Sequence, residues 1–128
     1  TVSATGTITL QDRASRVHVG LQYITDIETL DIEDFGERAA NGKQKQITSL
    51  VMKFKDTRGL LYGPNTDSLK EMKQREDEPY GAPTELLTGS KELQTMAQWN
   101  DNGRLFFRQK EPLPITILSL TPDIQTED

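Results

Sequence analysis

The chain has 128 residues, the length of one ordinary domain, and a net charge of −5. It contains no cysteine, which excludes disulfide bonds and thiolate metal sites. Its acidity argues against a protein that holds nucleic acid through a basic surface. No segment approaches the roughly 18 consecutive apolar residues of a membrane-spanning helix. Apolar residues make up 34% of the chain, below the usual share of about 45%, so we expect a small core with long polar connections.

Apolar and polar residues alternate in two segments near the N-terminus, which predicts two strands. Thr5–Leu10 alternates threonine with isoleucine and leucine. Arg16–Ile24 places four apolar side chains on one face, because residues two apart point to the same side of a strand. These four residues are Val17, Val19, Leu21 and Tyr23. Asp26–Leu30 continues this strand past a bend, and we expect Asp31–Gln46 to be a loop with at most one short helix.

The strongest strand signal lies at Ile47–Lys55. Leu50, Met52 and Phe54 are apolar and share one face, and they alternate with the residues of the opposite face. Ile47 has the opposite parity from these three. We therefore expect a β-bulge at Thr48 or Ser49, because one extra residue restores the register.

A tight hairpin turn is predicted at Asp56–Gly59, where Gly59 is free to adopt a positive φ. The returning strand begins at Leu60–Tyr62. After it, Thr66–Pro83 is long and polar. Because a long loop inside a compact domain usually contacts a partner or has a function, we regard this loop as a candidate contact segment.

The remaining segments complete an all-β pattern. Leu93–Trp99 fits both a helix and a strand, whereas Asn100–Gly103 predicts a turn. Strands are predicted at Arg104–Lys110 and at Ile115–Leu120. About seven short strands separated by turns predict an antiparallel β-sandwich or barrel with long polar loops, as a single module over residues 1–128.

Few side chains in the sequence suit catalysis. His18 is the only histidine, and it stands between two valines of a predicted strand without a second histidine as a partner. Two carboxylate groups, Asp31–Asp34 and Glu76–Glu78, lie in polar loops. A solvated acidic surface explains them better than the carboxylate pair of a glycoside hydrolase. We therefore expect no catalytic residue, no metal site and no cofactor.

Two kinds of side chain are candidates for contacts with other molecules. Basic residues around Lys43 form a positive strip on an acidic chain, which suits either a charged contact with a neighbouring subunit or the protection of an edge strand. Trp99 and Tyr80 suit an aromatic platform for a sugar, although a tryptophan before a turn more often closes a small core. Candidate subunit contacts are Lys43, Lys45, Arg58, Arg75 and Tyr80, and candidate platform residues are Trp99 and Tyr80.

Several short motifs occur in an order that resembles one protein family. In chain order they are Val19-Gly20-Leu21-Gln22-Tyr23, Glu28-Thr29-Leu30, Thr57-Arg58-Gly59, Gly63-Pro64, Arg108-Gln109 and Pro112-Leu113-Pro114. Together they resemble the tail nozzle proteins (tail tubular protein B) of short-tailed, T7-type phages, over most of the chain. Gln22 stands where the family has a proline, and the nozzle protein is several times longer than this chain.

The resemblance implies a structural part in a virion rather than an enzyme. Nozzle subunits form a six-fold ring at the end of the tail, below the adaptor, and tail fibres dock around it. The implied partners are copies of the same chain, tail adaptor proteins and tail fibre proteins, with DNA passing nearby without specific binding and no membrane span. Residues 1–128 are then expected to be one module of a longer protein in the virion tail. Asp31–Gln46 and Thr66–Pro83 are its expected contact loops.

A second interpretation of the sequence stays open beside the nozzle. It is a receptor- or carbohydrate-binding module at the tail tip. Such a module needs an exposed aromatic platform, for which Trp99 and Tyr80 are the candidates. The nozzle interpretation needs no such platform.

Overall fold

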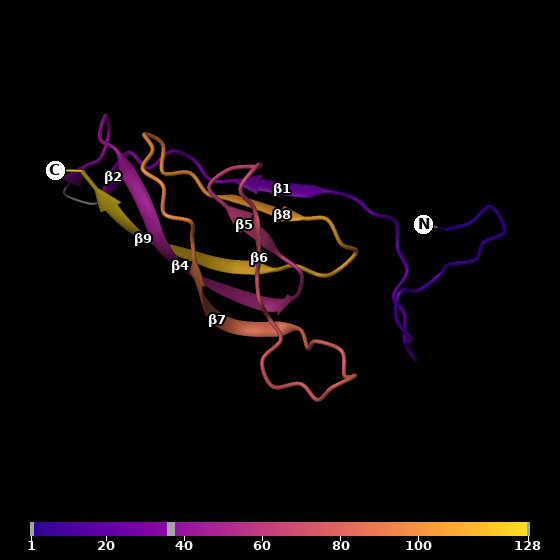
Figure 1. Cartoon of the computed structure of the whole chain (residues 1–128). Helices are drawn as coiled ribbons and strands as arrows, with labels where there is room; N and C mark the ends of the chain where they lie inside the picture. The colour runs from indigo at the N-terminus through magenta and orange to yellow at the C-terminus, as the bar shows by residue number, and fades with distance from the viewer. Residues whose placement is uncertain (1, 36–37, 128) are drawn as a thin grey trace.

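The chain folds into two antiparallel β-sheets that face each other (Figure 1). The computed structural model describes residues 2–35 and 38–127, and all regular structure in this part of the chain is β. The strands are β1 (Thr25–Glu28), β2 (Asp34–Phe35), β3 (Arg38–Ala39), β4 (Lys45–Thr57), β5 (Leu61–Gly63), β6 (Lys70–Glu71), β7 (Leu87–Gln94), β8 (Phe106–Gln109) and β9 (Ile117–Thr126). One sheet has the order β1-β8-β5-β6 and the other β7-β4-β9, while β2 and β3 form a separate hairpin. The predicted all-β sandwich of about seven strands is confirmed.

β4 is the central strand of the three-stranded sheet and pairs with β7 on one side and β9 on the other. It confirms the strong strand prediction and extends the strand at both ends. The predicted bulge is also confirmed, since the register against β9 shifts between Ile47 and Ser49. After the shift, Leu50, Met52 and Phe54 point to the inner face of the sheet, where all three are fully buried.

The core lies between the two sheets and takes side chains from both. Its buried members include Leu50, Met52, Phe54, Leu60, Tyr62, Met72, Leu93, Leu105 and Phe107. The Tyr62 hydroxyl on β5 donates a hydrogen bond to the Gln94 carbonyl on β7 at 3.1 Å, which links the sheets, and burial raises the pKa of Tyr62. Among the described residues, every buried side-chain nitrogen and oxygen has a hydrogen-bond partner.

The predicted hairpin at Asp56–Gly59 is wrong, because β4 and β5 lie in different sheets. The chain crosses there from one sheet to the other, and Gly59 has the expected positive φ of 81°. The Gln74 side chain holds this crossing. Its amide nitrogen donates to the Thr57 carbonyl at 2.8 Å, and its amide oxygen accepts the Gly59 N–H at 2.7 Å. A turn with a glycine has the same sequence pattern in a hairpin and in a crossing between sheets. The sequence alone therefore could not distinguish the two.

Residues 2–24 form an arm outside the sandwich, which we call the N-terminal arm (Figure 1). The strands predicted at Thr5–Leu10 and Arg16–Ile24 are not formed. The arm contains only an isolated bridge between Val2 and Ile8, and regular pairing starts at β1. A strand is stable only when its backbone groups pair with a neighbouring strand, and residues 16–24 pair with no described strand.

Both long polar segments contain structure that the sequence did not indicate. Asp31–Gln46 holds the β2–β3 hairpin instead of a short helix. Thr66–Pro83 contributes β6, and its Met72 is buried in the core. The strand predicted at Arg104–Lys110 is confirmed as β8. The ambiguous segment Leu93–Trp99 contains no helix. Its first two residues are the end of β7, which starts at Leu87, and the rest is the connection after β7.

The substitution Phe54→Ala is expected to lower the free energy of unfolding by about 3–5 kcal/mol, because it removes a fully buried ring and leaves a cavity. Val51→Ala changes the outer face of the same strand and should cost about 0.5 kcal/mol or less. Urea unfolding of both variants measures the difference. Equal costs would contradict the assignment of the inner face of β4 to the core.

A second stability test concerns Gly63 at the end of β5. A Cβ atom there would stand 2.0 Å from the Ser68 carbonyl oxygen, so Gly63→Ala forces the following loop to move. We expect a cost of about 1–3 kcal/mol in thermal unfolding. Gly42→Ala is the control, because Gly42 has a φ of 76° but nothing within 4 Å, and it should cost about 1 kcal/mol. A Gly63→Ala protein as stable as the original chain would disprove the close approach.

Candidate functional site

One carboxylate in each of the two groups singled out in the sequence accepts hydrogen bonds within the fold. Asp31 accepts a hydrogen bond from the Arg104 guanidinium, which lowers the pKa of Asp31. Glu78 accepts hydrogen bonds from the backbone N–H groups of Glu76 and Glu85 at 3.0 and 3.3 Å. Backbone hydrogen bonds, that of Glu78 itself first, lower the pKa of Glu78. Within residues 2–35 and 38–127, no three histidine or acidic side chains are grouped in a way that would hold a metal ion.

An ion pair fastens the base of the N-terminal arm to the sandwich. Asp26 on β1 lies opposite Arg108 on β8, and the guanidinium Nε and Nη2 donate to its carboxylate at 2.7 and 2.9 Å. The Arg108 guanidinium also lies 5.4 Å from the centroid of the Phe106 ring. The hydrogen bonds from Arg108 lower the pKa of Asp26. This two-pronged contact holds β1 in place although all four of its side chains are exposed.

Lys45 does not fit its predicted role as a subunit contact. Only 2% of the residue is exposed, and its ammonium donates to the Asp101 carbonyl at 2.6 Å. Its backbone forms a bridge with Asn100. The charge of Lys45 is therefore used inside the chain, where it closes one end of the sandwich. The sequence did not reveal this, because a lysine before an apolar run looks like a surface residue.

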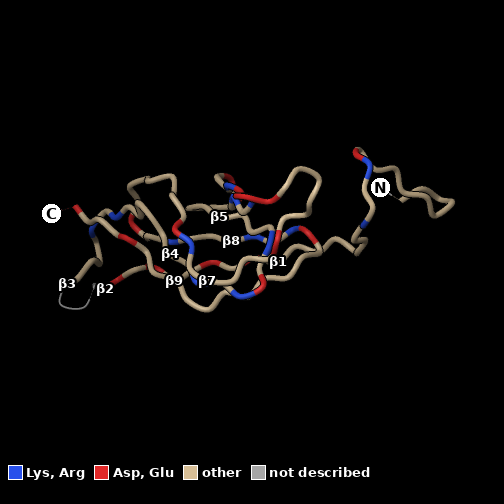
Figure 2. The backbone as a smooth tube through the Cα atoms, turned by 90° about the horizontal axis from the view of Figure 1, so that it is seen from below, with Lys and Arg blue, Asp and Glu red and all other residues tan. Residues whose placement is uncertain are grey.

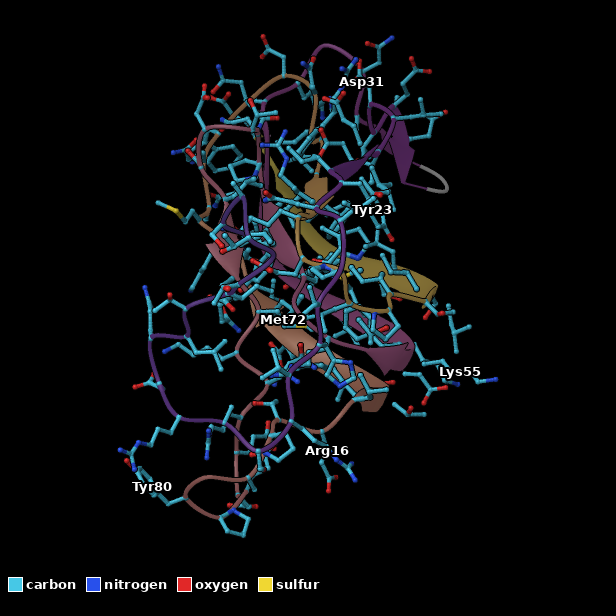
Figure 3. The ribbon with its side chains drawn as sticks, turned by 90° about the vertical axis from the view of Figure 1, so that its right-hand side faces the viewer. Arg16, Tyr23, Asp31, Lys55, Met72 and Tyr80 are labelled. Carbon is cyan, nitrogen blue, oxygen red and sulfur yellow. The ribbon has the colours of Figure 1, made fainter. Side chains whose placement is uncertain are left out.

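The other candidate contacts are available at the surface. Lys43 is exposed in the turn before β4. Tyr80 stands fully exposed in the loop between β6 and β7, at the opposite end of Figure 3 from Asp31. Arg58 and Arg75 line one concavity, so the structure brings together two of the five predicted contacts.

Trp99 and Tyr80 do not form a common aromatic platform. Trp99 is half-exposed next to Asn100, which pairs with Lys45 at the start of β4. Tyr80 lies in the loop before β7, whose first residue pairs with Thr57 at the other end of β4. β4 has 13 residues and therefore spans roughly 40 Å, at about 3.3 Å per residue. A single sugar ligand cannot reach both rings.

The N-terminal arm presents an apolar stripe to solvent. The four residues predicted to share a face are all exposed, and Leu21 is 91% exposed. The arm leaves the sandwich beside Pro112, since a Cβ at Gly20 would stand 2.9 Å from the Pro112 Cβ. An unpaired strand with alternating apolar residues is the form that adds to a sheet edge of another chain. The sequence showed the alternation but not that the arm lacks a partner within the described chain.

A concavity of about 840 Å³ lies where the chain crosses between the sheets, and we call it the basic concavity. Its charged lining residues are Arg58, Lys70, Lys73, Arg75, Lys110, Glu71 and Glu111. Five cations and two acids give a formal charge of +3, in a chain of net charge −5. Leu61, Met72 and Leu113 form apolar walls. None of the five cations forms an ion pair with another described residue.

No known protein family matches the sequence, and no curated protein matches it either. The described part of the chain contains no helix that is long and apolar enough to cross a membrane. The resemblance to nozzle proteins therefore stays a prediction from short motifs.

The Asp26–Arg108 pair gives the stability of the fold a pH dependence. Because the pKa of Asp26 is lowered from its usual value near 3.8, the pair stabilises the fold above that pH and loses its effect as the pH falls through the lowered pKa. Asp26→Asn should therefore lower the urea midpoint at pH about 6, with the difference shrinking at pH about 2. Asp12→Asn in the arm is the control and should change neither midpoint. A difference of the same size at both pH values would rule out the ion pair as its source.

Proposed function

We propose that the chain is a structural module of the tail nozzle of a short-tailed phage, which contacts copies of itself in a ring around the channel. The observation that carries this proposal is the N-terminal arm with its exposed apolar stripe. The arm contains the motif Val19-Gly20-Leu21-Gln22-Tyr23, the first motif of the family resemblance. The first motif of the resemblance thus lies in the segment that forms no strand within its own sandwich.

The free sheet edges support the proposal, because they offer a place for such an arm. β7 and β9 are the outer strands of the three-stranded sheet, with eight and ten residues. Each pairs with β4 on one side only, so backbone groups on the other side are free to pair with a strand from another chain. Arg16–Ile24 has nine residues, a length that suits either edge. Strand addition of this kind joins subunits with main-chain hydrogen bonds and fixes their register through alternate side chains.

The chemistry of the described surface also favours assembly over catalysis. Asp31 is tied to Arg104, and Glu78 is tied to backbone N–H groups, which suits structural acceptors rather than acids and bases. The chain keeps a net charge of −5, and repeated copies around a channel would repel the like charge of DNA. A ring of this kind lets DNA pass without holding it.

The receptor- or carbohydrate-binding alternative has weaker support. It needs aromatic side chains that face one ligand, and the two candidates lie at opposite ends of β4. Trp99 alone offers a half-exposed indole, three residues after Met96, which is also exposed. A titration of Trp99 fluorescence with host-surface glycans tests this alternative directly.

The substitution pair Val19→Asp and Leu21→Asp is expected to weaken assembly of the chain, alone or on a tail adaptor ring, by at least about tenfold, because it removes apolar side chains that would be buried against a neighbour. Light scattering of the chain with and without the adaptor measures the mass of the complexes. The thermal midpoint should stay within about 2 °C, since these side chains are exposed within one chain.

Met96→Asp is the matched control, because Met96 is also an exposed apolar residue but lies in the connection after β7, outside both the arm and the edge strands. It tests whether any exposed apolar residue has the same effect. A closed complex of six copies, or co-migration with the adaptor ring, supports the nozzle. A chain that stays monomeric both alone and with the adaptor overturns the proposal.

A further inference from the structure

The basic concavity gathers five cations whose side chains have few partners within the described chain, where only Arg75 donates a hydrogen bond, to the Pro79 carbonyl at 3.1 Å. Its five cations have no ion-pair partner there, and its formal charge of +3 opposes the net charge of the whole chain. Exposed cations gathered in a hollow repel one another, so an anionic partner lowers the electrostatic free energy of the site. The lining therefore favours a ligand with several negative charges.

The apolar walls of the concavity narrow the class of ligand. Leu61, Met72 and Leu113 stand among the cations, and the lining includes no aromatic ring on which a base could stack. Glu71 and Glu111 also lie between the cations, where they would repel a continuous row of phosphates. An acidic polypeptide segment with an aliphatic side chain fits this mixed lining better than a nucleic-acid backbone does.

The chain itself carries such a segment at its other end. Residues 30–34 contain three acidic residues, Asp31, Glu33 and Asp34, of which Asp31 is paired with Arg104. Leu30 is 87% exposed, and Glu33 and Asp34 are also exposed. Figure 2 shows the red acidic residues near β2 and the C-terminus, at the end of the sandwich away from the arm. We call residues 30–34 the acidic tip.

The two surfaces cannot meet within one chain. The acidic tip lies beside the start of β4, because the Ile32 N–H bonds the Asn102 carbonyl and Ile32 lies close to Gly103 and Lys45. The basic concavity lies beyond Thr57, at the other end of the same strand, roughly 40 Å away at about 3.3 Å per residue. Any contact between them therefore joins two molecules.

We infer that the basic concavity of one copy binds the acidic tip of the next copy, head to tail. Leu30 enters between the apolar walls, and Glu33 and Asp34 pair with cations of the rim. A head-to-tail contact uses two different surfaces on each copy, and such contacts close into a ring when the rotation between copies permits it. That these contacts close into a ring rests on the proposed function. The contact between two copies is inferred from charge and geometry alone.

A charge-exchange experiment tests the contact on the full chain. The concavity variant carries Lys73→Glu and Lys110→Glu, and the tip variant carries Glu33→Lys and Asp34→Lys. Sedimentation velocity at low salt should show self-association of the original chain, weakened about tenfold in each variant and also weakened by added salt. Mixing the two variants should restore association, because the unchanged tip of one variant meets the unchanged concavity of the other, while the reversed concavity faces the reversed tip.

Lys53→Glu with Lys55→Glu is the matched control, since it changes the net charge as much as the concavity variant does. Both lysines are exposed on β4, and Lys55 points away from the body in Figure 3. Thermal unfolding of every variant confirms that it is folded. The control should associate like the original chain apart from the general repulsion that its added charge causes.

Three results would overturn the inference. They are a chain that stays monomeric at millimolar concentration, a concavity variant that associates as the control does, and variants whose mixture does not regain association. Binding of a 20-base-pair DNA duplex that is lost in the concavity variant would reassign the surface to nucleic acid. Binding to the adaptor distinguishes the two proposals.

Arm variants that lose binding to the adaptor but associate head to tail as the original chain does would show that the two contacts are independent. An original chain that associates head to tail but does not bind the adaptor would support this contact and contradict the nozzle proposal.

Discussion

The packing of the inner face of β4 against the facing sheet is the constraint on which the rest of the structure depends. Leu50, Met52 and Phe54 are fully buried, and they meet Tyr62 and Phe107 from the other sheet. Both neighbours of β4 pair only with β4 in their sheet. The burial of one strand face therefore holds together the two sheets and both outer strands, which is how a chain with few apolar residues still forms a core.

Polar side chains complete the sandwich where the apolar core ends. Gln109 is buried, and its amide nitrogen donates to the Arg58 and Leu113 carbonyls at 2.9 and 3.2 Å. Gln74 holds the crossing between the sheets in the same way, and Lys45 closes the far end through Asp101. These hydrogen bonds satisfy backbone groups that the irregular connections would otherwise bury unpaired. They also fix the walls of the basic concavity, because Arg58 and Leu113 belong to its lining.

The core leaves several distinct surfaces of the chain free for contacts with other molecules. The N-terminal arm offers an unpaired segment with exposed apolar side chains, and the sheet edges of β7 and β9 offer unpaired backbone groups. At the two ends of β4 stand a basic concavity and an acidic tip. Such surfaces, set apart on one rigid body, let each copy contact its neighbours through different parts of the chain. The proposed structural module in a ring would use all of these surfaces.

The sequence by itself determined the all-β class, the strand through Leu50, Met52 and Phe54, the bulge before it and the positive φ of Gly59. These features depend on alternation and on local backbone sterics, which neighbouring residues decide. Only the tertiary structure decided that Asp56–Gly59 crosses between sheets, that Lys45 is buried and that the N-terminal arm lies outside the sandwich. The pairing of a strand and the burial of a charge depend on residues far away in the chain. A local sequence pattern does not identify those distant partners.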